Sequence, residues 1–244
     1  AKSATDWRRD HVGASGIGEE CERKIYNSFR WWRRPGYMTD GRVLRLFRRG
    51  SREELDLADD FRAAGVQVST GPDNLSQWSK RVLGGRFGWS MDFALLGLKE
   101  LPGVWHMGEA KTHNKKSFDL LVKHGVKKSK PVHYSQCLIY CELFGFTWAC
   151  YVAVCKDDDR IYIERFKHDP IYAGELLEKA LDIVTAKKPP NRISARAYFY
   201  QCQWCDYFES CHLGASPVKS CRTCAYSEPV LDNTTQREKS RDNI

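Results

Sequence analysis

Three charged residues near the middle of the chain have the types and spacing needed for chemistry on phosphate esters. Asp92 stands among apolar neighbours, and Glu109 and Lys111 follow it beyond a Leu-Pro-Gly turn at 101–103. Residues two apart on a strand project from the same face, so Glu109 and Lys111 are expected side by side. If the turn closes a hairpin, Asp92 and Glu109 converge on one small volume.

Two converging carboxylates would bind a hard divalent cation, Mg²⁺ or Mn²⁺, because these ions prefer oxygen ligands. Lys111 beside them would orient or acidify a nucleophilic water, or stabilise negative charge as it develops. Glu-x-Lys alone is a short motif. Without context it is more typical of a solvated ion pair on the polar face of a sheet, so the surrounding elements must decide between the two interpretations.

Hydrophobic periodicity and turn residues predict the elements that position these side chains. Helices are expected at residues 15–30, 40–64, 132–144 and 170–186. Extended segments are expected at residues 66–70, 80–83, 89–98, 104–112, 147–155 and 160–166. The segments on either side of 101–103 and of 156–159 are expected to form hairpins. The order predicts an α/β fold with a mixed central β-sheet flanked by helices.

The composition limits the class of protein. Of 244 residues, 42% are hydrophobic and 12% aromatic, which excludes a chain disordered throughout. No apolar run suits a transmembrane helix and no secretion signal is visible, which favours a cytoplasmic protein, in the bacterial host if the chain is phage-encoded. Lys and Arg (39) exceed Asp and Glu (31), and the formal net charge of +8 favours a polyanionic partner.

Four motifs occur in a fixed order along the chain: Phe47–Glu54, Gly88–Asp92, Glu109–Lys111 and Gln136–Tyr140. Together they resemble the PD-(D/E)XK nuclease superfamily, and within it the RecB-like branch and the CRISPR-associated and phage iron–sulfur exonucleases. Glu109-Ala-Lys111 stands for the family's (D/E)xK, and Gln136-Cys-Leu-Ile-Tyr140 for the QxxxY helix of the RecB-like branch. The resemblance spans residues 15 to 211, but no Pro-Asp pair precedes the strand of Asp92.

The resemblance implies a restriction-endonuclease-like core that hydrolyses phosphodiester bonds with one or two Mg²⁺ or Mn²⁺ ions. The family's metal ligands correspond here to Glu54, Asp92, Glu109 and the carbonyl of Ala110. Glu53 is the alternative to Glu54. Lys111 would activate or place the attacking water. Gln136 and Tyr140, one helical turn apart, would position the DNA backbone beside the metal.

Ten cysteines in such a chain are better interpreted as thiols or metal ligands than as disulfides. In the iron–sulfur exonucleases, one cysteine of the first helix and three after the core ligate a [4Fe–4S] cluster. The resemblance assigns these positions to Cys21, Cys202, Cys205 and Cys211. The alternative is a zinc site that joins Cys202 and Cys205 to Cys221 and Cys224, which leaves Cys21 and Cys211 without a role.

Basic residues with interleaved aromatics predict a DNA-facing surface. Eight arginines lie between residues 30 and 52, and a second basic stretch spans residues 123–130. About half of these residues are expected to be ordinary solvated or packing residues. The expected DNA-binding residues are Arg30, Trp31, Arg33, Arg34, Arg45, Arg48, Arg49, Lys127 and Lys128.

The expected organisation is a nuclease core at 1–200, a cysteine-rich metal-binding segment at 201–228 that packs on the N-terminal helix, and a disordered tail at 229–244. The expected function is a divalent-metal-dependent DNA exonuclease in recombination, replication or end processing, with a recombination or replication protein as its partner. One alternative is an endonuclease or flap nuclease with the same site. Another is a non-catalytic, zinc-containing nucleic-acid-binding module, which would not need the clustered acids and lysine.

Overall fold

The chain divides into two compact units. One comprises residues 1–44, 81–88 and 178–244, and the other comprises residues 45–80 and 89–177. The computed structural model describes residues 9–33, 41–73 and 77–231. The second unit contains the central sheet and the predicted catalytic motifs, whereas the first contains the N-terminal helix and the cysteine-rich segment. Residue 200, the expected end of the core, falls inside the first unit.

The central sheet has five strands in the order β2-β5-β6-β7-β8. Their bounds are Gln67–Ser69 for β2, Phe93–Leu96 for β5, His106–His113 for β6, Trp148–Cys155 for β7 and Ile161–Lys167 for β8. Strands β6 and β7 run parallel and the other neighbours run antiparallel, so the sheet is mixed, as predicted. Both expected hairpins, β5–β6 and β7–β8, are present.

The register of the β5–β6 hairpin depends on Gly108, which lies opposite Phe93. A Cβ atom on Gly108 would overlap the Phe93 ring and lie 2.9 Å from the Phe93 carbonyl oxygen, so a glycine is needed here. The next residue, Glu109, pairs with Tyr151 of β7. The close approach at Gly108 therefore sets the position of Glu109 in the sheet.

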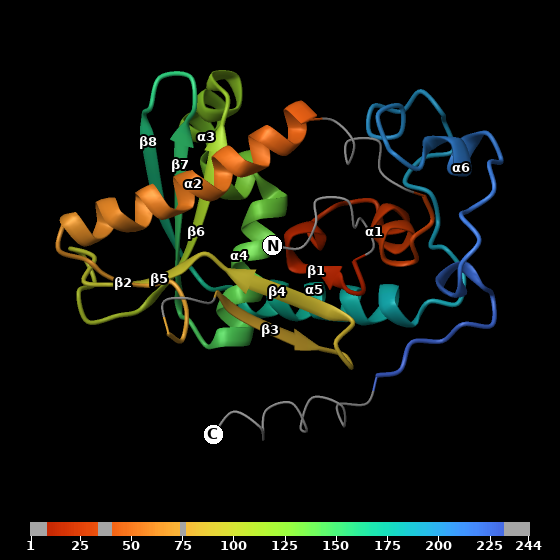
Figure 1. Ribbon diagram of the computed structural model, residues 1–244, viewed down its shortest axis with the longest axis horizontal. Coiled ribbons are helices and arrows are strands. Elements are labelled where there is room, and N and C mark those ends of the chain that lie inside the picture. The colour runs from red at the N-terminus through yellow and green to blue at the C-terminus, as the bar shows by residue number, and fades with distance from the viewer. Residues whose placement is uncertain (1–8, 34–40, 74–76, 232–244) are drawn as a thin grey trace. The chain divides into compact units, whose positions relative to one another are not determined.

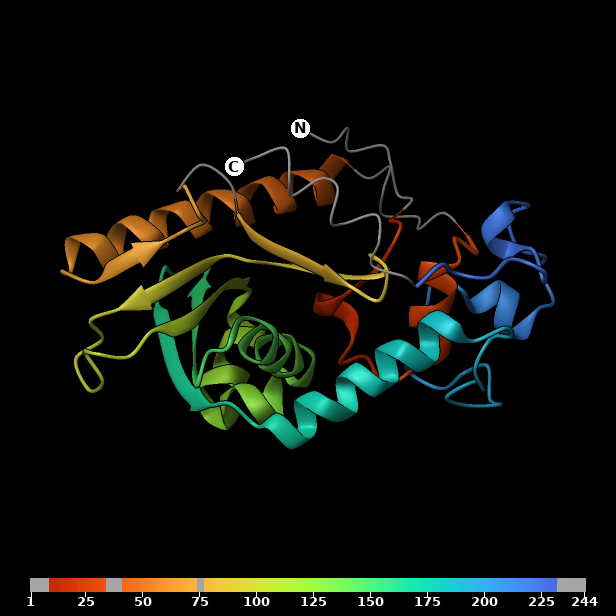
Figure 2. The same ribbon diagram turned by 90° about the horizontal axis from the view of Figure 1, so that it is seen from below.

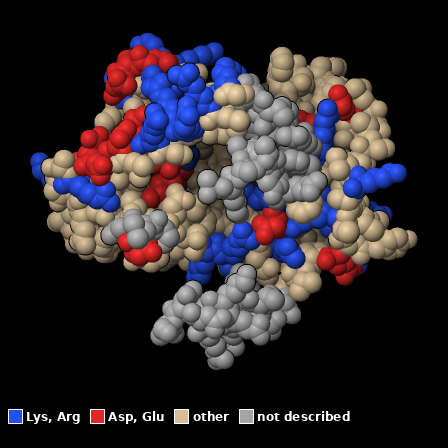
Figure 3. All heavy atoms as spheres, viewed as in Figure 1, with Lys and Arg blue, Asp and Glu red and all other residues tan. Residues whose placement is uncertain are grey.

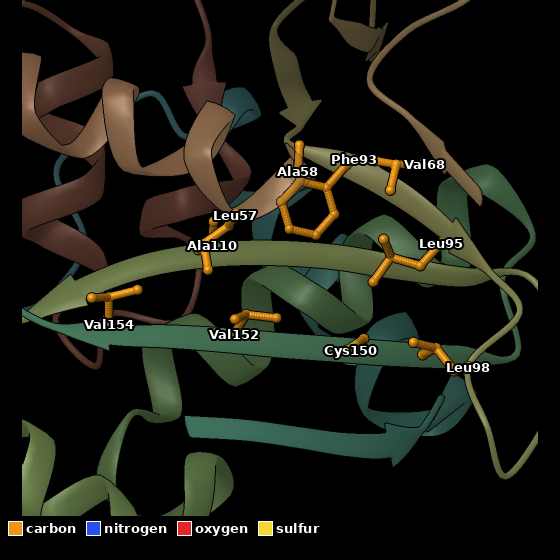
Figure 4. Packing of buried hydrophobic residues seen from close by; sticks show 10 residues of the cluster. All are labelled: Leu57, Ala58, Val68, Phe93, Leu95, Leu98, Ala110, Cys150, Val152 and Val154. Atoms are coloured by element: carbon orange, nitrogen blue, oxygen red, sulfur yellow. The ribbon is translucent and has the colours of Figure 1, made fainter. Parts of the chain in front are cut away.

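One face of the sheet packs against α2 (Gly41–Ala63). Figure 4 shows the buried cluster between them: Leu57, Ala58, Val68, Phe93, Leu95, Leu98, Ala110, Cys150, Val152 and Val154. Each Å² of apolar surface buried there contributes about 25 cal/mol. Since Leu57 and Ala58 anchor α2, the carboxylates one turn earlier on this helix are held close to the sheet.

The opposite face carries α3 (Lys115–Ser129) and α4 (Pro131–Phe144), both of which contact β6 and β7 (Figure 1). Helix α4 begins at Pro131, suited to a first turn, and ends at Gly145, whose φ of 79° favours glycine. Helix α3 is absent from the elements expected above. Its buried residues, Phe118 and Leu121, are at helical spacing, but lysines dominate the segment.

The first unit contains α1 (Glu22–Phe29), β1 (Val12–Gly13), α6 (Phe208–His212) and the 3-10 turns Ala14–Gly16 and Cys221–Thr223. Strand β1 joins a second sheet of order β1-β4-β3, with β3 at Trp78–Val82 and β4 at Phe87–Met91. Helix α5 spans Pro170–Thr185. The helix expected at 15–30 begins only at Glu22, because a 3-10 turn occupies its predicted start. Within the described ranges, no helix is long and apolar enough to cross a membrane.

Two arginines, Arg30 and Arg222, join the C-terminal segment around residues 221–227 to the end of α1. Figures 1 and 2 both show this part of the chain beside α1. Arg30 donates a hydrogen bond of 3.1 Å to the carbonyl of Cys224. In return, Arg222 donates one of 2.8 Å to the carbonyl of Phe29. The Arg222 guanidinium also lies 4.5 Å from the Trp31 ring centroid and 4.8 Å from that of Phe29. These contacts fix the Cys221–Thr223 turn to the end of α1.

Candidate active site

Asp92 and the Glu109–Lys111 segment meet, as the hairpin predicts. Asp92 occupies the bend between β4 and β5, and its Oδ2 accepts a 2.9 Å hydrogen bond from the backbone N–H of Ala110. Glu109 and Lys111, two residues apart on β6, form an ion pair. The hairpin thus brings two carboxylates and one ammonium group together.

Glu109 is fully buried, and only one of its carboxylate oxygens is satisfied. Its Oε1 accepts hydrogen bonds from Lys111 Nζ and from Gln136 Nε2, the latter at 2.6 Å. Its Oε2 is shielded from solvent and has no hydrogen-bond partner among the described residues. A buried oxygen without a partner costs free energy of folding, so an additional ligand at Oε2 would stabilise the site.

Gln136 and Tyr140 share one face of α4, and both are buried. Gln136 Nε2 donates to Tyr140 Oη at 2.8 Å as well as to Glu109. The resemblance predicts that this pair positions the DNA backbone. In the structure Gln136 contacts Glu109 and Tyr140, and these contacts hold the carboxylate of Glu109 in place. The contact of this pair with DNA stays a prediction.

A hollow of about 470 Å³ opens between α2 and β6. Its lining residues are Leu46, Phe47, Gly50, Ser51, Glu53, Glu54, Ala110, Lys111 and Thr112. Lys and Arg side chains gather over the first half of α2, and Asp and Glu along its second half (Figure 3). Glu54 interacts electrostatically with Asp92 and Lys111, whereas Glu53 interacts with Arg49 and other residues away from the site. Glu54 is therefore the glutamate that faces the catalytic motifs.

The three acids crowd around a single lysine. Burial, and then the charge of Asp92, raise the pKa of Glu54 to about 7 against the opposing charge of Lys111. Burial likewise raises the pKa of Asp92 and of Glu109. Burial alone would lower the pKa of Lys111, but the carboxylates of Glu109 and Asp92 outweigh it and raise that pKa. The raised pKa values disfavour the ionisation of all three acids at once, and a bound cation would neutralise their charge when they ionise.

The donor set suits Mg²⁺ or Mn²⁺, because every donor is an oxygen and Glu109 Oε2 is an unused buried acceptor. In the part of the chain that the structure describes, no three His, Cys, Asp or Glu side chains are placed so that they could hold a metal ion as they stand. Lys111 contacts both Glu109 Oε1 and the Ala110 carbonyl. A cation that binds these oxygens would therefore compete with the Lys111 ammonium.

A second polar cluster beside the site is absent from the predicted residues. Tyr151 Oη lies 2.9 Å from His113 Nε2 and 2.8 Å from His133 Nδ1. Burial, followed by repulsion from nearby lysines, lowers the pKa of His113 to about 4; burial, then Lys111, lowers that of His133 to about 3. Both imidazoles are therefore neutral near pH 7. The sequence offers two signals for the cluster: His113 follows Lys111 by two residues on β6, and His133 precedes Gln136 by one turn.

The four cysteines expected to ligate a cluster, Cys21, Cys202, Cys205 and Cys211, line one cavity of about 370 Å³ in the first unit. Burial raises the pKa of the Cys202 thiol, and the charges of Cys21 and Cys211 act in the same direction, so these sulfurs lie within electrostatic reach of one another. Cys221 and Cys224 are exposed and do not line this cavity.

The residues expected to contact DNA fall into two groups. Arg30 is only 5% exposed and its guanidinium is bound to backbone carbonyls, so the prediction that it contacts DNA is wrong. The Trp31 indole donates to the Arg9 carbonyl at 2.7 Å and its ring lies against Arg222, so Trp31 also serves packing within the first unit.

The remaining basic residues lie nearer the surface. Arg33 forms an ion pair with Glu209. Lys127 Nζ lies 5.3 Å from the centroid of the Tyr134 ring. Arg49 donates to the carbonyl of Lys156 at 2.9 Å. Side chains exposed to solvent belong to Arg45, Arg48, Arg49, Lys127 and Lys128. Arg34 lies outside the described residues.

Several solved structures resemble this chain in their fold. An alkaline exonuclease (LHK-Exo) from Laribacter hongkongensis matches with a TM-score of 0.50 and 18% identity, over 75% of this chain and 90% of that chain. The complex of LHK-Exo with dAMP matches with a TM-score of 0.50 and 19% identity over the same shares, 75% and 90%. A structure described as SSO0001 has a TM-score of 0.45 at 14% identity, over 86% of this chain and 89% of that chain.

The chain thus shares its fold with an alkaline exonuclease, and its mixed α/β sheet flanked by helices is consistent with a restriction-endonuclease-like core. No protein-family model matches the chain, and no characterised protein matches it in sequence.

Proposed function

We propose that this protein is a divalent-metal-dependent deoxyribonuclease that degrades DNA from its ends. The observation that carries the proposal is the buried Glu109 beside Asp92 and Lys111, one of whose oxygens has no hydrogen-bond partner among the residues that the structure describes. The similarity in fold to an alkaline exonuclease supports a nuclease acting on DNA, and the dAMP complex of that protein supports a nucleotide as the group bound.

Within the site, oxygen donors would hold one or two Mg²⁺ or Mn²⁺ ions: Glu54, Asp92, Glu109 and the carbonyl of Ala110. When bound, the metal would supply Lewis-acid activation of the phosphodiester. Lys111 would turn from Glu109 to the scissile phosphate or the attacking water, where its charge stabilises developing negative charge. Gln136, itself held against Tyr140, would keep Glu109 in position.

The basic residues on α2 would receive the DNA backbone. Arg45 and Arg48 lie on the helix that forms one wall of the hollow, and both are exposed. Phosphate contacts of this kind give affinity without sequence preference and weaken as salt increases. DNA with free ends, in recombination, replication or end processing, is the substrate that we propose, with a recombination or replication protein as the partner.

We further propose that Cys21, Cys202, Cys205 and Cys211 hold a [4Fe–4S] cluster. Their placement around one cavity favours this set over a zinc site with Cys221 and Cys224, which do not line it. The cluster would tie the start of α1 to the C-terminal segment. Anaerobic purification should give a brown protein that absorbs at about 400 nm, and Cys21→Ser should lose the colour. Stoichiometric zinc without iron would overturn the assignment.

The mode of cleavage is tested with end-labelled linear DNA, single- and double-stranded, beside covalently closed circles. With Mg²⁺ or Mn²⁺, linear DNA should be degraded and circles should survive. Lys111→Ala and chelation of the metal should each abolish degradation. Cleavage of circles would favour an endonuclease with the same site. Binding without any cleavage would favour the non-catalytic module.

A further inference from the structure

A basic segment with exposed aromatic rings connects α5 to α6 as irregular chain (Figure 1). Residues 187–205, the aromatic segment, contain four Lys or Arg residues, four aromatic residues and no Asp or Glu. Nothing in the proposed nuclease mechanism uses these side chains. The segment lies in the first unit, whereas Glu109 and Lys111 lie in the second.

Three of the four rings are turned to solvent: Tyr198 is 75% exposed, Tyr200 63% and Trp204 86%. The fourth, Phe199, is half-buried, with its ring centroid 4.7 Å from that of Tyr200. Phe199 and the buried Cys202 therefore pack the segment against the rest of the unit, and the three exposed rings do not. Large aromatic surfaces left in water in one place mark a binding surface.

Two of the rings and one arginine of the segment lie at one opening. Tyr200, Trp204 and Arg192 line the cavity that also contains the four cysteines. The Tyr200 hydroxyl accepts a 2.8 Å hydrogen bond from Gln201, whose amide also donates to Glu20 at 2.5 Å. These contacts hold the Tyr200 ring in a fixed orientation at the surface.

The charges at this opening favour an anion. Arg192 lines the opening and Arg196 follows it by four residues in the segment; both are exposed and neither has an ion-pair partner among the described residues, whereas Lys187 is paired with Glu228. Of the acids that line the cavity, Glu19 is already paired with Lys24 at 2.7 Å, and Asp206 follows the segment. Arginine beside stacked aromatics is the combination that binds phosphates and bases of an unpaired strand.

We propose that the aromatic segment binds a single strand of DNA, with Tyr200 and Trp204 stacked on bases and Arg192 and Arg196 on phosphates. Every base has a face for stacking, so the binding tolerates any sequence. A protein partner could also cover the rings. Binding of a protein would not explain why the 19 residues of the segment include no Asp or Glu, whereas binding of a polyanion would. This surface goes beyond the proposed nuclease site and does not depend on its activity.

The test measures fluorescence anisotropy of a labelled single-stranded oligonucleotide and of a blunt duplex, without added divalent cation, so that cleavage is not involved. Trp204→Ala and Tyr200→Ala should each weaken single-strand binding about 5-fold or more. Trp204→Phe, which keeps a ring, should restore most of the affinity. Tyr226→Ala is the matched control, because Tyr226 is 94% exposed outside the segment and should have no effect.

Unchanged single-strand affinity in Trp204→Ala and Tyr200→Ala would overturn the proposal and favour a protein partner for the rings. Equal losses for single strand and blunt duplex, or no rescue by Trp204→Phe, would also overturn it, because the rings would then act through structure. A parallel Mg²⁺ cleavage assay separates the two claims. Single-strand binding that depends on the rings in a protein without nuclease activity supports this inference and contradicts the proposed function alone.

Discussion

Gln136 donates a 2.6 Å hydrogen bond to Glu109 Oε1 from the buried face of α4. Lys111 donates to the same oxygen, so one carboxylate oxygen accepts two donors while Oε2 accepts none among the described residues. The two donors fix the orientation of the carboxylate, and this orientation leaves Oε2 available. The hydrogen bond between Gln136 and Glu109 therefore links α4, which carries the QxxxY motif, to β6, which carries the (D/E)xK motif.

Replacement of Gln136 by alanine should lower kcat by about 10- to 100-fold, because Glu109 would lose the contact that orients it. The KM for DNA should stay the same, since Gln136 is buried and acts through Glu109. Steady-state cleavage of labelled DNA measures both constants. Gln67→Ala, at an exposed position on β2, is the control. A raised KM with an unchanged kcat would mean that Gln136 contacts DNA, as the resemblance implies.

In the metal-free protein, the stabilisation that Glu54 contributes should decrease as pH rises. The pKa of Glu54 increases from 4.5 to about 7 in the folded state, so the folded chain binds this proton more tightly than the unfolded chain. That stabilisation is complete below pH 4.5 and is lost as pH rises towards about 7. The Tm of the wild-type chain should therefore decrease relative to the Tm of Glu54→Gln when both are measured from pH 5 to pH 8, a comparison in which the contributions of His113 and His133 cancel.

Added Mg²⁺ should raise the Tm more at pH 8 than at pH 6, because the ionised carboxylates are the form that binds the cation. Glu54→Gln should reduce this difference. A Mg²⁺ effect that is independent of pH, or an identical pH dependence in the variant, would show that Glu54 does not contribute to the cation site.

Gly108→Ala should lower the free energy of unfolding by about 1–3 kcal/mol, because the added methyl group overlaps Phe93 in the adjacent strand. Urea denaturation provides the measurement. Gly103→Ala is the matched control, since no atom of the described residues lies within 4 Å of a Cβ atom at that position. Equal stability of the two variants would show that the β5–β6 register does not depend on Gly108.

Replacement of Arg30 should affect stability, whereas replacement of Arg48 should affect DNA binding. Arg30→Ala should lower the free energy of unfolding by about 2–3 kcal/mol, because carbonyls of the C-terminal segment lose a charged donor, while DNA affinity changes little. Arg48→Ala should leave stability unchanged and weaken DNA binding in a salt-dependent manner. Binding and unfolding measured on both variants decide the matter. A loss of DNA affinity confined to Arg30→Ala would reverse the assignment.

The sequence was most informative where local chemistry decides the structure. Strand alternation and the turn at 101–103 predict the β5–β6 hairpin, and the hairpin alone brings Asp92 to Ala110. The helix over 40–64 and the helix from Pro170 also follow from local signals, a hydrophobic stripe in the first case and an N-terminal proline in the second.

The features that the sequence did not predict depend on tertiary contacts. Arg30 is the same residue type as the exposed arginines of α2, but hydrogen bonds to the C-terminal segment hold it in a buried position. The His113–Tyr151–His133 cluster joins two strands and a helix that are far apart in sequence. The lysines of α3 indicate a solvated stretch, whereas the burial of Phe118 and Leu121 against the sheet makes it a helix.

The central claim is that Asp92 and Glu109 together hold the catalytic cation. The most direct test is anomalous scattering from Mn²⁺ in crystals of the protein. A peak in contact with Asp92 and with Glu109 Oε2 is expected, and Glu109→Gln should lose it. A peak elsewhere, or none at a Mn²⁺ concentration that supports cleavage, would contradict it.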